Sequence, residues 1–102
     1  RVPTQNVSVV DFKFNSKNET SIKEINEAIK TASENELKNI LSFNDKKLVS
    51  SDFNHNPSSS IFHSDQTKVM NKKFVRILSW YDNEWGFSNR MCDTALEIGK
   101  YI

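Results

Sequence analysis

The side chains of this sequence best suited to bind a ligand lie in one stretch, residues 79–90. It reads Ser-Trp-Tyr-Asp-Asn-Glu-Trp-Gly-Phe-Ser-Asn-Arg and holds both tryptophans of the chain. Aromatic rings supply the walls of a binding site, and the cluster Asp82-Asn83-Glu84 between them supplies hydrogen-bond donors and acceptors. We therefore expect a ligand to be held at this junction.

A structural interpretation of the same stretch is also open. Trp80, Tyr81 and Trp85 would then be core residues, and Asp82 would cap the helix that follows. Arg1, taken alone, is a terminal arginine of the kind usually exposed to solvent. Residue types alone do not decide between the two interpretations.

The other reactive side chains give weaker signals. We expect Cys92 to be a small buried hydrophobe rather than a nucleophile, since free cysteine is among the most buried residue types. His55 and His63 lie in or beside a Ser/Asn-rich loop, and we expect both to be exposed to solvent. No metal-ligand spacing joins them, so no metal site is predicted. A single cysteine also excludes an internal disulfide and is compatible with a reducing cytosol.

Length and composition narrow the function classes. The 102 residues make one domain at most, and a net charge of +1 gives no strong field for nucleic acid or an anionic membrane. No apolar run approaches the roughly 18 residues of a transmembrane helix. With only Gly86 and Gly99, the chain has neither a G-x-G-x-x-G turn nor a Walker loop, so it cannot by itself hold a dinucleotide pyrophosphate.

Hydrophobic periodicity predicts the elements that position residues 79–90. Residues 7–14 indicate a strand, with Phe12 and Phe14 facing inward. Ser21 and Glu24 form a capping box, and the apolar stripe after them predicts a helix ending near Asn35. Residues 37–43 fit either a helical turn or a strand. The remaining predicted strands are residues 48–53, 60–62 and 73–78, of which the last is central.

Gly86 is expected to end that central strand, after which Phe87, Met91 and Ile98 follow a helical stripe to the C-terminus. The order β, α, several β, α predicts an α+β fold. We expect a mostly antiparallel sheet, one covering helix and a C-terminal helix at residues 86–102.

Several separated motifs, in the same order, resemble the C-terminal third of glyceraldehyde-3-phosphate dehydrogenases. They are Arg1-Val2-Pro3-Thr4, Asn6-Val7-Ser8-Val9-Val10-Asp11, Ser51-Asp52-Phe53, Ser59-Ser60-Ile61-Phe62 and Ser79-Trp80-Tyr81-Asp82-Asn83-Glu84. The resemblance runs from end to end. It implies that residues 1–102 are a fragment, the C-terminal part of a catalytic domain, with the NAD-binding Rossmann domain outside this chain.

The resemblance also implies an activity. Family members are cytoplasmic homotetramers of glycolysis that oxidise glyceraldehyde 3-phosphate to 1,3-bisphosphoglycerate, with NAD and inorganic phosphate as partners. Their cysteine nucleophile and histidine base lie in motifs that this sequence lacks. The resemblance thus implies no catalytic residue here, and we expect the 102 residues alone to be inactive.

Two positions match binding residues of the family. Arg1 corresponds to an arginine that binds the substrate phosphate, a role suited to a planar guanidinium. Asn83 corresponds to the asparagine that binds the nicotinamide carboxamide, where one amide complements another. Tyr81 and Glu84 belong to the same patch as supporting residues.

Two alternatives accompany this interpretation. Phe87 stands where many family members have tyrosine, and residues 52–57 and 83–87 also resemble erythrose-4-phosphate dehydrogenase, a close relative. A free-standing interaction domain without catalysis is the alternative of another class. The choice between NAD and NADP depends on residues outside this chain.

Overall fold

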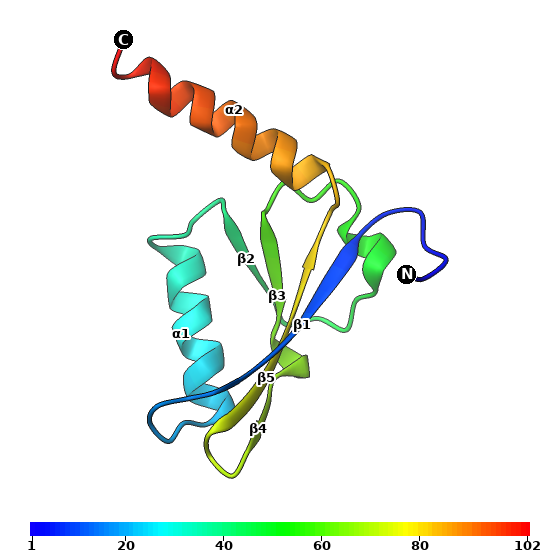
Figure 1. Ribbon diagram of the computed structural model, residues 1–102, viewed down its shortest axis with the longest axis vertical. Coiled ribbons are helices and arrows are strands. Elements are labelled where there is room, and N and C mark those ends of the chain that lie inside the picture. The colour runs from blue at the N-terminus through cyan, green and yellow to red at the C-terminus, as the bar shows by residue number, and fades with distance from the viewer.

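The computed structural model describes residues 1–102 and contains five strands and two α-helices (Figure 1). The predicted α+β class with a mostly antiparallel sheet is confirmed. In chain order the elements are β1 (Ser8–Asn15), α1 (Ile22–Glu34), β2 (Leu41–Asn44), the 3₁₀ turn η1 (Ser50–Phe53), β3 (Ser60–His63), the 3₁₀ turn η2 (Ser64–Gln66), β4 (Lys68–Met70), β5 (Phe74–Tyr81) and α2 (Trp85–Gly99).

The sheet is built around β5, which pairs antiparallel with β1, β3 and β4, while β2 runs parallel to β3. Val75 and Leu78 on β5 are buried, as expected of a central strand. The register of β1 on β5 pairs Ser8 with Tyr81. This pairing brings the N-terminal segment beside the stretch at residues 79–90.

Helix α1 begins and ends where its capping signals predict. The Glu24 N–H donates to the Ser21 hydroxyl at 3.2 Å, and Asn35 closes the last turn by donating to the Thr31 and Ala32 carbonyls. Ile25 and Ile29 on its apolar stripe are half-buried. The helix lies beside β2 and covers that side of the sheet (Figure 1).

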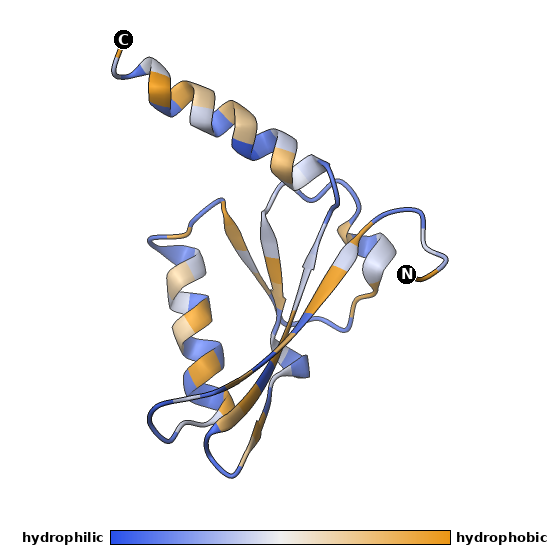
Figure 2. Cartoon of the chain, in the orientation of Figure 1, coloured by the Kyte–Doolittle hydropathy of each residue, from blue (hydrophilic) through white to orange (hydrophobic).

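The core is small: six hydrophobic residues are buried, Val7, Phe53, Ile61, Phe62, Val75 and Leu78. Val7, Phe53 and Ile61 form one buried cluster, against which Leu48 and Trp80 pack. Hydrophobic residues also occur along β1 and α2 (Figure 2), and many of them are exposed. Phe12 and Phe14 stack on one face of β1, where Phe14 pairs with the buried Val75. Phe14 is half-buried, whereas Phe12 is 52% exposed, because β1 is an edge strand.

Residues 48–53 were predicted to be a strand, and the structure has the turn η1 there instead. The Asp52 carboxylate accepts a hydrogen bond from the Val49 N–H at 2.8 Å, and such local bonding competes with strand pairing. Phe53 is buried at the end of the turn. Of the two possibilities for residues 37–43, the structure contains both, a turn followed by β2. The elements η2 and β4 were not predicted.

Helix α2 begins at Trp85, so the prediction that Gly86 separates strand from helix is wrong. Gly86 lies in the first turn, where a Cβ atom would sit 2.8 Å from the carbonyl oxygen of Ser58. The rest of α2 projects away from the sheet (Figure 1). Cys92 is therefore exposed, contrary to the prediction of a buried thiol, because no element of this chain covers it. Neither helix has the length and apolarity needed to cross a membrane.

Candidate ligand-binding site

Both ends of the chain contribute to one cleft of about 560 Å³, a size typical of small-molecule sites. Its walls come from the N-terminal segment, the start of β1, η1 and the end of β5. They are formed by Arg1, Val2, Thr4, Val7, Ser8, Val9, Ser50, Trp80, Tyr81 and Asn83. The cleft thus brings together three of the four predicted site residues, Arg1, Tyr81 and Asn83.

Asp82 organises the turn that carries Asn83 from β5 into α2. Its carboxylate is buried, and Oδ1 accepts hydrogen bonds from the backbone N–H groups of Glu84 at 3.1 Å and Trp85 at 2.8 Å. These groups are among the first N–H groups of α2, which lack partners within the helix. The N-cap residue of α2 is Glu84, so Asp82 is not the cap that the structural interpretation predicted, although it binds the N–H groups at the start of the helix. The same turn presents Asn83 to the cleft.

The other carboxylate oxygen of Asp82 joins two further segments. Oδ2 accepts from Asn6 Nδ2 at 2.8 Å and from the backbone N–H of His55 at 2.9 Å. Burial of the carboxylate acts to raise its pKa. The hydrogen bonds from Trp85, His55, Asn6 and Glu84 together outweigh burial and hold the pKa of Asp82 below its usual value. Asp82 thus stays ionised and links three segments of the chain.

Asn83 is exposed at the rim of the cleft, with its amide half-satisfied. Oδ1 accepts a hydrogen bond from the Ser8 hydroxyl at 2.6 Å, and the backbone N–H donates to Asn6 Oδ1 at 3.4 Å. The side-chain Nδ2 has no partner in the chain. Its two hydrogens are free to donate to a ligand carbonyl.

Val7 has a strained backbone between these two contacts. Its φ of 73° lies in the left-handed region, which is rare for a β-branched residue. Such strain costs on the order of 1–3 kcal/mol and persists where surrounding contacts determine it, often at functional sites. No local pattern in the sequence predicts this conformation. The roles of Asn6 and Ser8 are not predicted either, because they depend on contacts with residues 82 and 83.

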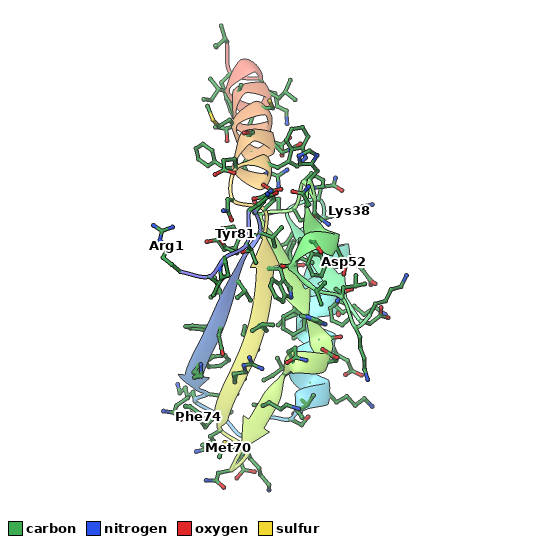
Figure 3. The ribbon with its side chains drawn as sticks, turned by 90° about the vertical axis from the view of Figure 1, so that its right-hand side faces the viewer. Arg1, Lys38, Asp52, Met70, Phe74 and Tyr81 are labelled. Carbon is green, nitrogen blue, oxygen red and sulfur yellow. The ribbon has the colours of Figure 1, made fainter.

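Arg1 lines the cleft and Glu84 lies outside it. The side chain of Arg1 extends outward from the N-terminal segment (Figure 3), and both Arg1 and Tyr81 line the cleft. The Arg1 guanidinium is exposed and forms no ion pair within the chain. Glu84 is exposed and does not line the cleft. Its backbone N–H supports the site through Asp82, while its side chain makes no hydrogen bond.

The two histidines differ from each other. His63 is buried at the end of β3, so the prediction that it is a solvated loop residue is wrong. Its Nδ1 accepts from the Trp80 indole N–H at 3.0 Å, and Nε2 lies 3.0 Å from the Lys46 carbonyl oxygen and from Asp65 Oδ1. The imidazole therefore orients Trp80, which lines the cleft. His55 is exposed and stacks on Trp85.

A larger cleft of about 760 Å³ lies between α1, β2 and the start of α2. Its walls are mostly polar, and the most buried of its cations, Arg90, is already engaged. That guanidinium donates to the carbonyls of Asn39 and Pro57 and forms an ion pair with Asp93 at 2.6 Å. This cleft contains none of the predicted site residues. No three His, Cys, Asp or Glu side chains are grouped as metal ligands.

The chain is similar to proteins of known family along its whole length. Residues 1–83 match the family model described as the C-terminal domain of glyceraldehyde 3-phosphate dehydrogenase. The glyceraldehyde-3-phosphate dehydrogenase of Xanthobacter flavus is 66% identical over 100 residues, which cover 98% of this chain and 30% of that protein. The Cereibacter sphaeroides enzyme is 59% identical over 102 residues, 100% of this chain and 31% of that protein. The Sordaria macrospora enzyme is 48% identical over 100 residues, with 98% and 30% covered.

Proposed function

The chain belongs to the glyceraldehyde-3-phosphate dehydrogenase family, and on that premise we propose that it forms part of the active site of a phosphorylating, NAD-dependent enzyme of glycolysis. The chain spans about 30% of the length of the relatives cited above. In the proposed reaction, glyceraldehyde 3-phosphate and inorganic phosphate give 1,3-bisphosphoglycerate. The observation that carries the proposal is that Arg1 and Asn83 line one cleft.

Arg1 is the proposed ligand of the substrate phosphate. Its guanidinium is exposed and has no carboxylate partner in the chain, so all its N–H groups are available. A guanidinium can grip two phosphate oxygens at once through a planar pair of donors. Arg1 would thereby fix the distance of the substrate from Asn83.

Asn83 is the proposed ligand of the nicotinamide carboxamide. The site fits this group, because the free Nδ2 of Asn83 is a donor beside a cleft with the aromatic walls Trp80 and Tyr81. When bound, NAD supplies the acceptor for the hydride that leaves the substrate. Asn83 orients the ring, and Asp82 holds Asn83 by fixing the turn on either side of it.

The nucleophile and the general base of the proposed enzyme lie outside these 102 residues. Cys92 is on an exposed face of α2 and does not line the cleft, while His63 is buried and both its ring nitrogens are engaged. The pyrophosphate-binding fold is also outside the chain. The 102 residues alone would therefore have no dehydrogenase activity.

The proposal extends to assembly and location. Val10 and Phe12 on β1, with Phe87, Met91 and Ile98 on α2, expose apolar side chains that an associated surface would cover. The complete enzyme would be a homotetramer. A cytoplasmic location accords with the chain's single cysteine, which is a free thiol.

A chimaera tests the function. The segment of the Xanthobacter flavus relative that this chain matches is replaced by the chain, and NAD reduction is followed with glyceraldehyde 3-phosphate and phosphate. We expect activity, a raised KM for the aldehyde in Arg1→Ala and a raised KM for NAD in Asn83→Ala. Lys47→Ala, an exposed cation outside both clefts, is the matched control for Arg1.

The outcomes separate the alternatives. A folded chimaera that does not reduce NAD would contradict the proposal. A higher kcat/KM with erythrose 4-phosphate would assign the alternative substrate. An inactive chimaera together with a cooperatively folded, monomeric 102-residue chain would favour a free-standing interaction domain.

A further inference from the structure

The side-chain amide of Asn83 is held in one orientation by Ser8. The Ser8 hydroxyl donates to Asn83 Oδ1 at 2.6 Å, which occupies the acceptor end of the amide. The donor end, Nδ2, faces no group of the chain. The oxygen of the amide is therefore bonded within the chain, and its NH₂ group is left to donate to a ligand.

Ser8 is itself fixed and is not a mobile surface serine. It is half-buried at the start of β1, where the sheet register pairs it with Tyr81, two residues before Asn83. The preceding Asn6 binds the same turn twice, donating to Asp82 Oδ2 at 2.8 Å and accepting from the Asn83 backbone N–H at 3.4 Å. Ser8 is thus held by strand pairing, and the turn that carries Asn83 is held by the side chain of Asn6.

The backbone strain at Val7 supports a positioning role for this segment. The Val7 side chain is buried among Phe53 and Ile61, although its φ is 73°. The unfavourable conformation is retained while the residues on both sides, Asn6 and Ser8, bond to the Asp82–Asn83 turn. Backbone strain that is maintained by contacts on both sides is often found at functional sites.

We propose that Ser8 sets the orientation of the Asn83 amide, so that the site recognises the carbonyl oxygen of a nicotinamide-type cofactor and not its amino group. This inference rests on the proposed function, because it assumes that Asn83 binds the carboxamide. It goes further by naming a positioning residue and the part of the cofactor that is selected. Ser8 acts through Asn83 and does not contact the reacting atoms.

Two cofactor analogues distinguish the two ends of the carboxamide. The 3-acetylpyridine analogue of NAD keeps the carbonyl oxygen and replaces the amino group by methyl. The thionicotinamide analogue keeps the amino group and replaces the oxygen by sulfur, a weak acceptor. In the chimaera with the unchanged chain, we expect a KM for the thionicotinamide analogue roughly five- to tenfold above that for the acetylpyridine analogue, the effect of one hydrogen bond.

Substitution of Ser8 tests its role in this preference. Ser8→Ala removes the donor, frees Oδ1 and lets the amide rotate, so the ratio of the two KM values should fall to about one while the KM for glyceraldehyde 3-phosphate stays unchanged. Ser8→Thr keeps a hydroxyl and should retain the ratio. Ser88→Ala is the matched control, an exposed serine of α2 that makes no hydrogen bond to Asn83.

The result separates this inference from the function on which it rests. A ratio that is the same in Ser8→Ala, or an unchanged chain that prefers the thionicotinamide analogue, overturns the inference even if NAD is reduced normally. Failure of the folded chimaera to reduce NAD overturns the proposed function instead. An Asn83→Ala variant that reduces NAD with an unchanged KM overturns the assignment of Asn83 to the carboxamide, and with it this inference. If Ser8→Ala does not fold, the analogue preference of the unchanged chain still decides the orientation of the amide.

Discussion

The turn at residues 82–85 and the later turns of α2 are neighbours in the sequence, but they differ in how many contacts the rest of the chain makes with them. In the turn, one buried carboxylate accepts four hydrogen bonds from three separate segments. In α2, Gly86 is the one buried residue, and Met91, Leu96 and Ile98 are exposed. The Asp82 carboxylate and the N–H groups around it are therefore bonded within the chain, whereas the apolar side chains of α2 are left without partners.

Of the substitutions that test this comparison, Asp82→Ala should lower the free energy of unfolding most. The variant leaves the N–H groups of His55, Glu84 and Trp85 and the Asn6 amide without their acceptor, and should lower the free energy of unfolding by about 3 kcal/mol. Urea unfolding of the chimaera, followed by tryptophan fluorescence, measures it. Asp45→Ala, an exposed carboxylate without a hydrogen bond, is the control. Equal losses in the two variants would show that the turn is not specially stabilised.

Gly86→Ala tests the close packing at the start of α2. The new Cβ would lie 2.8 Å from the Ser58 carbonyl oxygen, so the backbone must shift, and we expect a loss of about 1–3 kcal/mol. Gly99→Ala, at the other end of the helix, meets nothing within 4 Å and should be neutral or stabilising by up to about 1 kcal/mol. The same unfolding measurement applies. Opposite signs at the two glycines support the comparison, and equal effects would contradict it.

Acid should weaken the ion pairs that Asp11 on β1 forms with Arg76 and Lys13, within a defined range of pH. Hydrogen bonds from Arg76 and Lys13 lower the pKa of Asp11 from 3.8 to about 2. Because the pKa is lower in the folded state, the stabilisation is present above about pH 4 and is lost as the pH falls towards 2. Asp11→Asn should therefore show a smaller fall in melting temperature between these values. An unchanged slope would mean that the ion pair does not form.

Polar substitutions on α2 should have the smallest effect on stability and a visible effect on association. Leu96→Gln and Ile98→Gln change exposed side chains, so each should alter the free energy of unfolding by no more than about 0.5 kcal/mol. In the 102-residue chain they should reduce self-association, measured by light scattering. If self-association is unchanged, the chains associate through another surface, and β1 is the alternative.

Local signals in the sequence predicted much of the fold. The capping box at Ser21, the stripe of α1 and the apolar run of β5 depend on neighbouring residues, and the structure has these elements where they were expected. Residues 48–53 were mispredicted because the Asp52 side chain closes a turn that an apolar pattern does not reveal. Cys92 and His63 were mispredicted because their burial depends on which distant elements cover them.

In the candidate site, too, some residues could be identified from the sequence, whereas others depend on contacts between distant segments. Arg1 and Asn83 were singled out by the family resemblance, and the pairing of β1 with β5 places them in one cleft. The residues that hold Asn83 were missed, because the bonds of Asn6 and Ser8 to the Asp82–Asn83 turn join opposite ends of the chain. No spacing rule connects such residues until the register of the two strands is known.

The pairing of β1 with β5 also sets the order in which the site can form during synthesis. β1 is made before β5, which is its one partner in the sheet. At about 5–20 residues per second, β1 waits several seconds on the ribosome with an unpaired edge and an exposed Phe12. The cleft can form only after Tyr81 and Asn83 have emerged, because both residues line it.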